Sequence, residues 1–115
     1  MKNNYEYWTY QDFLAYVLIY AAASDFNISA EEKEYIQKRV EKDEFEKILK
    51  CFKKHSEFER IEAVKILGKK FSKDIGSKSE IRKELVKLFY VDDDYSILEK
   101  NFFLMFKKIM NLHEE

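Results

Sequence analysis

Two acidic segments of this 115-residue chain carry side chains that could bind a cation. One begins at Asp25 and the other at Asp92, and both follow the same eight-residue pattern. An aspartate comes first, Asn or Asp third, an apolar or aromatic residue fourth, Ser fifth and Glu eighth. Carboxylate, amide and hydroxyl oxygens are the ligands that hard divalent cations such as Ca²⁺ prefer. A calcium-binding loop is therefore the first hypothesis to compare with the spacing.

The spacing excludes an EF-hand at either segment. An EF-hand loop needs Gly at its sixth position, for a sharp turn, and a bidentate Glu at its twelfth. In the first segment these positions hold Ala30 and Ile36, and in the second they hold Ile97 and Phe103. Both copies therefore lack both residues on which that loop depends.

Helix capping explains part of the same pattern. In each segment a Ser stands three residues before a Glu, namely Ser29 before Glu32 and Ser96 before Glu99. In such a capping box the Ser oxygen accepts a backbone N–H at the helix start, and the Glu accepts the N–H of the Ser. Both segments are thus predicted to open helices, whether or not they also bind an ion.

The rest of the sequence predicts helices on both sides of these segments. The chain contains no Pro and two Gly, and its apolar residues recur every three or four positions. We predict an all-α fold, a single-domain bundle of about six helices over residues 1–115, with related helix–loop–helix units at about 10–42 and 78–112. The expected helices cover residues 10–24, 30–42, 44–54, 57–72, 78–91 and 97–112. Their predicted capping boxes begin at Thr9, Ser29, Asp43, Ser56, Ser77 and Ser96, and Gly76 is expected in a turn before the fifth helix.

The two segments resemble the TerB-like family, the tellurite-resistance protein B group of helical domains. The likeness rests on the Ala-rich run at 21–23 that leads into the first segment and on the second copy near the C-terminus, and it covers about residues 12–112. Family members usually have Gly where this chain has Phe26 and Asp93, so the first loop is expected to be built differently. The resemblance implies a compact helical domain with pseudo-symmetric halves, associated with tellurite or other stress responses and with no established catalytic activity.

By the same resemblance, the acidic loops are expected to bind a cation or a protein partner. The corresponding positions are Asp25 and Glu32 in the first copy and Asp92 and Glu99 in the second. If the loops meet at one end of the bundle, these carboxylates would bind a divalent cation such as Ca²⁺ or Mg²⁺, which would relieve their mutual repulsion. The hypothesis therefore requires the two aspartates to converge.

Other reactive residue types are few. The one cysteine, Cys51, occupies an apolar helical position, where we expect a buried and inert thiol. His55 and His113 lack the spacing of metal ligands, and we expect both to be solvated. The sequence contains neither a Gly-rich phosphate loop nor a nucleophile elbow. We therefore expect a non-enzymatic protein, and the resemblance to the TerB-like family implies an accessory or scaffolding domain with a protein partner.

The uncharged run at residues 13–23 is too short to span a membrane. The residues before it include two acids and one lysine, whereas a signal peptide needs a positively charged start. We therefore predict that this run forms a central core helix. A single cysteine is compatible with a reducing compartment, and we expect a cytoplasmic protein.

An uneven distribution of charge suggests an alternative function. Residues 47–87 contain thirteen basic and six acidic side chains, whereas residues 1–46 contain five and ten. Lys47, Lys50 and Lys54 recur at helical spacing, so the expected third to fifth helices could present a basic face. Such a face could bind an acidic protein or nucleic acid, although interspersed acidic residues weaken the nucleic-acid hypothesis. The alternative is therefore a protein- or nucleic-acid-interaction module.

The N-terminal segment is rich in rings, with Tyr5, Tyr7, Trp8 and Tyr10. It could form an exposed docking arm, or its rings could pack onto the bundle. We favour packing, because aromatic side chains bury a large apolar area.

Overall fold

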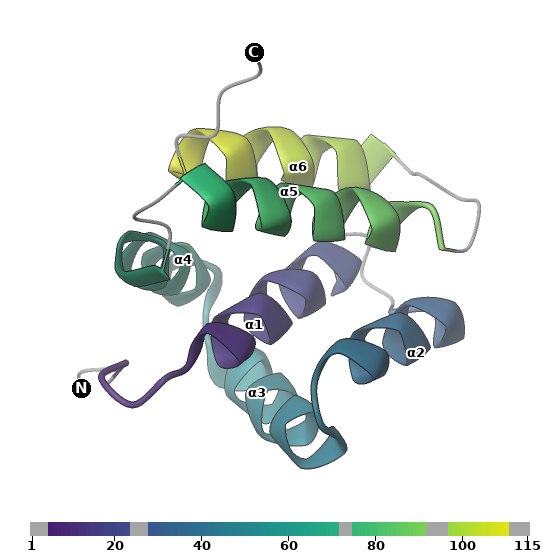
Figure 1. Cartoon of the computed structure of the whole chain (residues 1–115), viewed down its shortest axis with the longest axis horizontal. Helices are drawn as coiled ribbons and strands as arrows, with labels where there is room; N and C mark the ends of the chain where they lie inside the picture. Colours follow the sequence, from purple (N-terminus) through teal and green to yellow (C-terminus); the bar gives the residue numbers. More distant parts are fainter. Residues whose placement is uncertain (1–4, 24–27, 72–74, 92–96, 111–115) are drawn as a thin grey trace.

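The computed structural model describes residues 5–23, 28–71, 75–91 and 97–110, apart from the side chains of residues 75–78, 97–99 and 110. Its helices are α1 (Tyr10–Ala22), α2 (Ala30–Arg39), α3 (Lys42–Lys54), α4 (Glu57–Phe71), α5 (Ile75–Phe89) and α6 (Ile97–Met110). These residues contain no strand. The predicted all-α bundle of about six helices is confirmed (Figure 1).

Helix α1 runs through the middle of the bundle, and each of the other helices packs against it (Figure 1). Every α1 residue from Asp12 to Ala22 is buried. Because residues 13–23 contain no charged side chain, this helix has no polar face to turn toward water. A helix that is apolar on every side is stable only when other elements enclose it. The predicted central core helix is confirmed.

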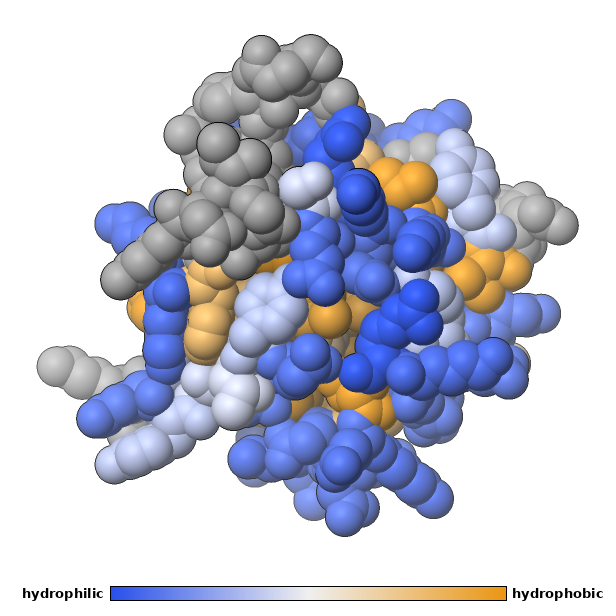
Figure 2. All heavy atoms as spheres, viewed as in Figure 1, coloured by the Kyte–Doolittle hydropathy of each residue, from blue (hydrophilic) through white to orange (hydrophobic). Residues whose placement is uncertain are grey.

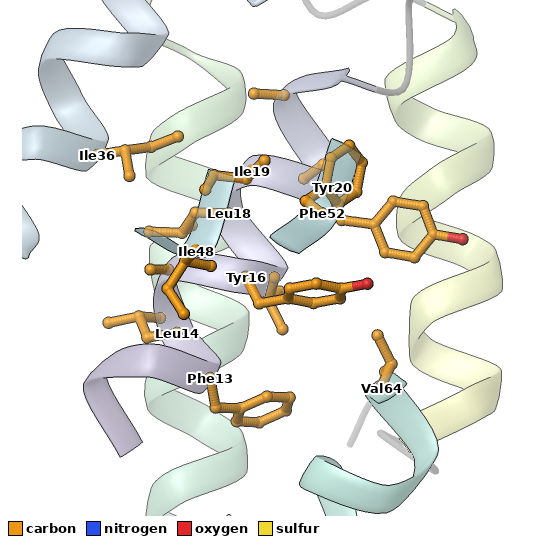
Figure 3. Packing of buried hydrophobic residues seen from close by; sticks show 14 of the residues in the cluster. Phe13, Leu14, Tyr16, Leu18, Ile19, Tyr20, Ile36, Ile48, Phe52 and Val64 are labelled. Carbon is orange, nitrogen blue, oxygen red and sulfur yellow. The ribbon is translucent and has the colours of Figure 1, made fainter. Parts of the chain in front are cut away.

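Aromatic rings fill much of the space between α1 and its neighbours (Figure 3). Tyr16 and Tyr20 of α1 both contact Phe52 of α3, with ring centroids 5.7 and 5.6 Å apart. Tyr20 also contacts Phe102 of α6, at 4.9 Å. Ring pairs of this kind contribute about 0.5–1.5 kcal/mol each beyond the burial of area. Two tyrosines of α1 thus connect it to α3 and α6.

Tyrosine–glutamate hydrogen bonds join helices at the margin of the core. Tyr35 of α2 donates to Glu84 of α5 at 2.7 Å, and Arg39 donates to the same carboxylate oxygen at 2.9 Å. Tyr10 of α1 donates to Glu80 of α5 at 2.9 Å. Bonds to a charged acceptor are stronger than neutral ones, so these contacts fix α5 against α1 and α2.

The capping boxes predicted at Thr9 and Ser56 are confirmed. Thr9 accepts the N–H of Asp12 at 3.1 Å, and the Asp12 carboxylate accepts the N–H of Thr9 at 3.0 Å. Ser56 and Glu59 form the same reciprocal bonds, at 3.2 and 2.7 Å. The box predicted at Ser96 lies outside the described residues.

The predicted junction of α2 and α3 is wrong. Helix α2 ends at Arg39, and α3 begins at Lys42, so Asp43 lies inside the first turn of α3. The N-cap residue is Glu41, which makes no side-chain capping bond. The helix is interrupted at Val40, which takes an extended backbone (φ −134°, ψ 153°) and buries its side chain. Asp43 still stabilises the start of α3, because an acidic side chain in the first turn interacts favourably with the positive end of the helix dipole.

The predicted start of α5 is also wrong. The helix begins at Ile75, so Gly76 and Ser77 lie in its first turn rather than in a preceding turn and cap. The first N–H groups of a helix have no acceptor inside it, and the penalty for glycine applies to helix interiors. Ser77, three residues before Glu80, therefore lies within the first turn of α5 and does not mark the start of the helix.

The N-terminal rings pack on the bundle, which confirms the favoured interpretation. Tyr5 is buried, and Trp8 contacts both Tyr5 and Tyr16 edge-on, at centroid distances of 5.2 and 5.7 Å. Lys70 of α4 donates to the backbone carbonyls of Tyr5 and Trp8 at 3.0 and 3.2 Å. Tyr7 is 80% exposed and takes no part in this packing.

We predict that Ala15→Leu destabilises the protein by about 1–3 kcal/mol, because extra atoms must then fit where α1 is already enclosed. Ala15 is fully buried. The matched control is Ala30→Leu at the exposed start of α2, which should change stability by less than about 0.5 kcal/mol. Urea unfolding followed by circular dichroism measures both variants. Equal midpoints for Ala15→Leu and the unmodified protein would contradict the enclosure of α1.

Candidate functional site

The predicted cation ligands are described only in part. Glu32 is 1% exposed and completes the capping box of α2. Its Oε1 atom accepts the N–H of Ser29 at 3.1 Å, and Ser29 Oγ accepts the N–H of Glu32 at 3.0 Å. Asp25 and Asp92 lie outside the described residues, as does the side chain of Glu99.

The convergence of the two acidic loops therefore stays a prediction. Where the structure is described, no group of three or more His, Cys, Asp or Glu side chains is arranged to hold a metal ion. The capping interpretation of the first segment is confirmed by Ser29 and Glu32. One carboxylate oxygen of the predicted ligand set is thus already bound to backbone.

A hollow of about 410 Å³ opens between the end of α1, the start of α2 and one flank of α3. It is lined by Ala23, Ile28, Lys33, Phe45, Leu49, Phe52 and Lys53. Phe45 and Phe52 belong to the buried stripe of α3, whereas Leu49 is turned partly away from it and remains half-buried. Helix α2 has ten residues and few apolar side chains, so it leaves this flank of α3 partly uncovered.

The charged side chains of this hollow are two lysines on different helices. Lys33 of α2 and Lys53 of α3 are both exposed. Lys47, Lys50 and Lys54 of α3 are exposed as well, and so is Glu46. The exposed charged residues of α3 after Glu46 are thus all lysines, while the floor of the hollow is apolar.

The basic face predicted to run over the third to fifth helices stays a prediction. Helices α3 and α5 both contact α1, and in Figure 1 they lie on different sides of it. The lysines of α3 and those of α5, such as Lys83 and Lys87, are therefore carried by helices that α1 separates in this view. On the side viewed in Figure 2, hydrophilic side chains cover most of the molecule and apolar ones show between them.

His55 is buried, so the prediction that it is solvated is wrong. Its Nδ1 atom lies 2.7 Å from the hydroxyl of Tyr16, and its Nε2 atom lies 3.7 Å from the sulfur of Cys51. Within the described part of the chain, Nδ1 is the hydrogen-bond partner of the Tyr16 hydroxyl. Because a buried hydroxyl is costly without an acceptor, we assign the ring proton to Nε2, where it is directed at the sulfur. His113 lies outside the described residues.

Burial favours the neutral forms of the two titratable side chains in this cluster, His55 and Cys51. Desolvation lowers the pKa of His55 below its usual value and raises the pKa of Cys51. Cys51 is half-buried rather than fully buried. A thiol with a raised pKa is a poor nucleophile, because the thiolate is the reactive form. The hydrogen bond between Tyr16 and His55 joins α1 to the end of α3. The raised pKa of Cys51 agrees with the expectation of an inert thiol.

A pair of carboxyl groups lies where α1 meets α3. Glu44 of α3 lies beside Asp12, which belongs to the capping box of α1, and this neighbour raises the pKa of Glu44. A nearby carboxylate has this effect because like charge disfavours the ionised form. Sequence analysis missed this pair because the residues are distant in sequence.

None of the residues that line the hollow was predicted as a site residue. Leu49 carries the available signal, because it lies four positions after Phe45 and three before Phe52, at the edge of the buried stripe. Whether that edge is covered depends on where α2 docks, and the periodicity of α3 alone does not predict the position of α2.

Comparison with known proteins adds no relative: no family model, no curated protein and no solved structure matches this chain. The resemblance to the TerB-like family therefore stays a prediction based on the repeated segment. None of the helices in the described residues has the length and hydropathy needed to cross a membrane.

We predict that stability falls as the pH is lowered through the range below 6.5, and that His55 causes part of this fall. Burial depresses the pKa of folded His55 from 6.5, so the unfolded chain binds more protons below that pH. The contribution of neutral His55 to stability is fully present above pH 6.5, and it is lost as the pH falls toward the pKa of His55 in the folded protein. In His55→Gln the fall should be smaller, as measured by urea unfolding between pH 5 and 8.

Tyr16→Phe is the control for this prediction. It removes the hydrogen bond at Nδ1, at a cost of about 1 kcal/mol at pH 7, but keeps a titratable ring at position 55. Its pH dependence should persist. Superimposable pH profiles for His55→Gln and the unmodified protein would show that His55 is not buried in its neutral form.

Proposed function

We propose that this chain is a non-catalytic accessory domain of the TerB-like type, which acts by binding a protein partner. The observation that supports this best is the apolar hollow between α2 and α3, with exposed lysines beside it. A partly uncovered apolar surface with charge at its margin has the composition of a protein interface, which has an apolar centre and a polar rim. The volume of about 410 Å³ also lies within the range of specific binding sites, about 300–1,000 Å³.

The polar side chains inside the bundle support binding over catalysis. Glu32 closes a capping box, Tyr16 bonds to His55, and Glu84 accepts hydrogen bonds from two residues of α2. Each of these contacts holds helices in position or satisfies a helix end. Side chains engaged in this way are poorly placed to transfer protons to a substrate.

A role in a tellurite or other stress response, and a Ca²⁺ or Mg²⁺ ion at the acidic loops, rest on the repeated segment alone. They stay predictions within this proposal. The nucleic-acid alternative has less support, because the lysines are divided between helices on different sides of α1 and acidic residues are interspersed among them.

Site-specific photocrosslinking tests the proposed function. The full chain carrying p-benzoylphenylalanine in place of Lys53 would be irradiated inside cells of the organism that encodes it. We expect a discrete adduct with one protein. A matched substitution at Lys69, an exposed residue of α4, should give none.

The adduct would be identified by mass spectrometry and the complex rebuilt from purified components. No adduct at Lys53, or the same adducts at Lys53 and Lys69, would contradict a binding role for the hollow.

A further inference from the structure

The chemistry of the hollow indicates what kind of partner segment it would accept. Its floor is made of side chains from three elements, with Phe45 and Phe52 from α3, Ala23 at the end of α1 and Ile28 before α2. Phe45 and Phe52 are almost fully buried, so they form a fixed base, while Leu49 is half-buried at the side. An apolar group that entered would remove the remaining exposed apolar area from water, at about 25 cal/mol per Å².

Ion pairing distinguishes the two lysines of the hollow from other surface lysines. Among the described residues, neither Lys33 nor Lys53 forms an ion pair. Elsewhere on the surface, Lys38 pairs with Glu34 and Lys65 pairs with Glu62. In the part of the chain that the structure describes, no carboxylate pairs with these two positive charges, which can therefore interact with a negatively charged ligand.

We propose that the hollow receives one large apolar side chain from an acidic segment of the partner, with the flanking carboxylates of that segment bound by Lys33 and Lys53. This inference rests on the proposed function and specifies its partner. Lys33 and Lys53 lie on different helices, so they can bind carboxylates on both sides of the inserted side chain. Charge of opposite sign across an interface raises the association rate and selects against other partners.

A peptide explains the distribution of charge better than a free fatty acid does. A fatty acid has one carboxylate, which would use one lysine. Two further exposed lysines of α3, Lys50 and Lys54, lie beside Lys53 and outside the lining of the hollow. A chain with several acidic residues can interact with this extended row as well as with the hollow.

Binding of short synthetic peptides to the full chain tests this inference. The probe is an acetylated and amidated peptide of sequence Glu-Asp-Glu-Phe-Glu-Asp-Glu, titrated into ¹⁵N-labelled protein and followed by NMR. We expect saturable shifts centred on α2 and the second half of α3. Replacing the Phe of the peptide by Ala should weaken binding about tenfold, which corresponds to loss of one anchoring side chain. Replacing its acids by Gln should weaken binding and remove its dependence on salt.

Protein variants locate the site. Lys33→Gln combined with Lys53→Gln should weaken peptide binding about three- to tenfold, as expected for two exposed ion pairs. The matched control combines Lys65→Gln with Lys69→Gln on α4, and it should bind like the unmodified protein. Leu49→Trp should fill the hollow and weaken binding about tenfold. Because the lysines are exposed, the charge variants are expected to fold normally, and circular dichroism confirms it.

Three results would overturn the inference. They are equal binding of the acidic peptide and its Gln analogue, equal loss in the two double-lysine variants, and saturable binding of decanoate without binding of the peptide. None of them would remove a protein adduct at Lys53 in the crosslinking experiment. The inference can therefore fail while the proposed function stands, and absence of the adduct would contradict the proposed function itself.

Discussion

Burial of α1 on every side requires other helices to surround it, and this requirement determines where the chain can present a functional surface. Because α1 has no charged side chain between residues 13 and 23, exposing any of its faces would place apolar area in water. The surrounding helices meet this need with amphipathic faces, and α3 supplies the clearest stripe in Phe45, Ile48 and Phe52. Their outer faces are then free to carry charge.

The hollow follows from the same constraint. Helix α2 is short and polar, and it contributes Ile36 and little else to the buried core. It can close the end of α1 but cannot also cover the flank of α3. Leu49 and the edges of the phenylalanine rings are left beside two lysines that form no ion pair with any described residue. The interior polar contacts, such as that of Tyr16 with His55, join α1 to the end of α3, which carries part of this surface.

The sequence predicts the helices well because their signals are local. The caps at Thr9, Ser29 and Ser56 and the uncharged run of α1 depend on residues a few positions apart. The starts of α3 and α5 were mispredicted because a Ser or Asp followed by an acid also occurs inside a first turn. In α3 the boundary depends on Val40, whose extended backbone follows from burial of its side chain against other helices.

The candidate site was much harder to predict, because it depends on contacts between elements distant in sequence. His55 follows the last residue of α3, where periodicity assigns no face, although Cys51 four residues earlier indicates the side it shares. The lysines of α3 and α5 look alike in sequence, and only the docking of both helices on α1 separates them.

Native-state amide hydrogen exchange measures the enclosure of α1 most directly. The amides of Val17, Leu18 and Ile19, which are fully buried, should exchange only through global unfolding, with an opening free energy equal to that of urea unfolding. Those in the middle of α2 should exchange through smaller local openings. If the α1 amides exchanged with a lower opening free energy than those of α2, α1 would not be the helix on which the bundle depends.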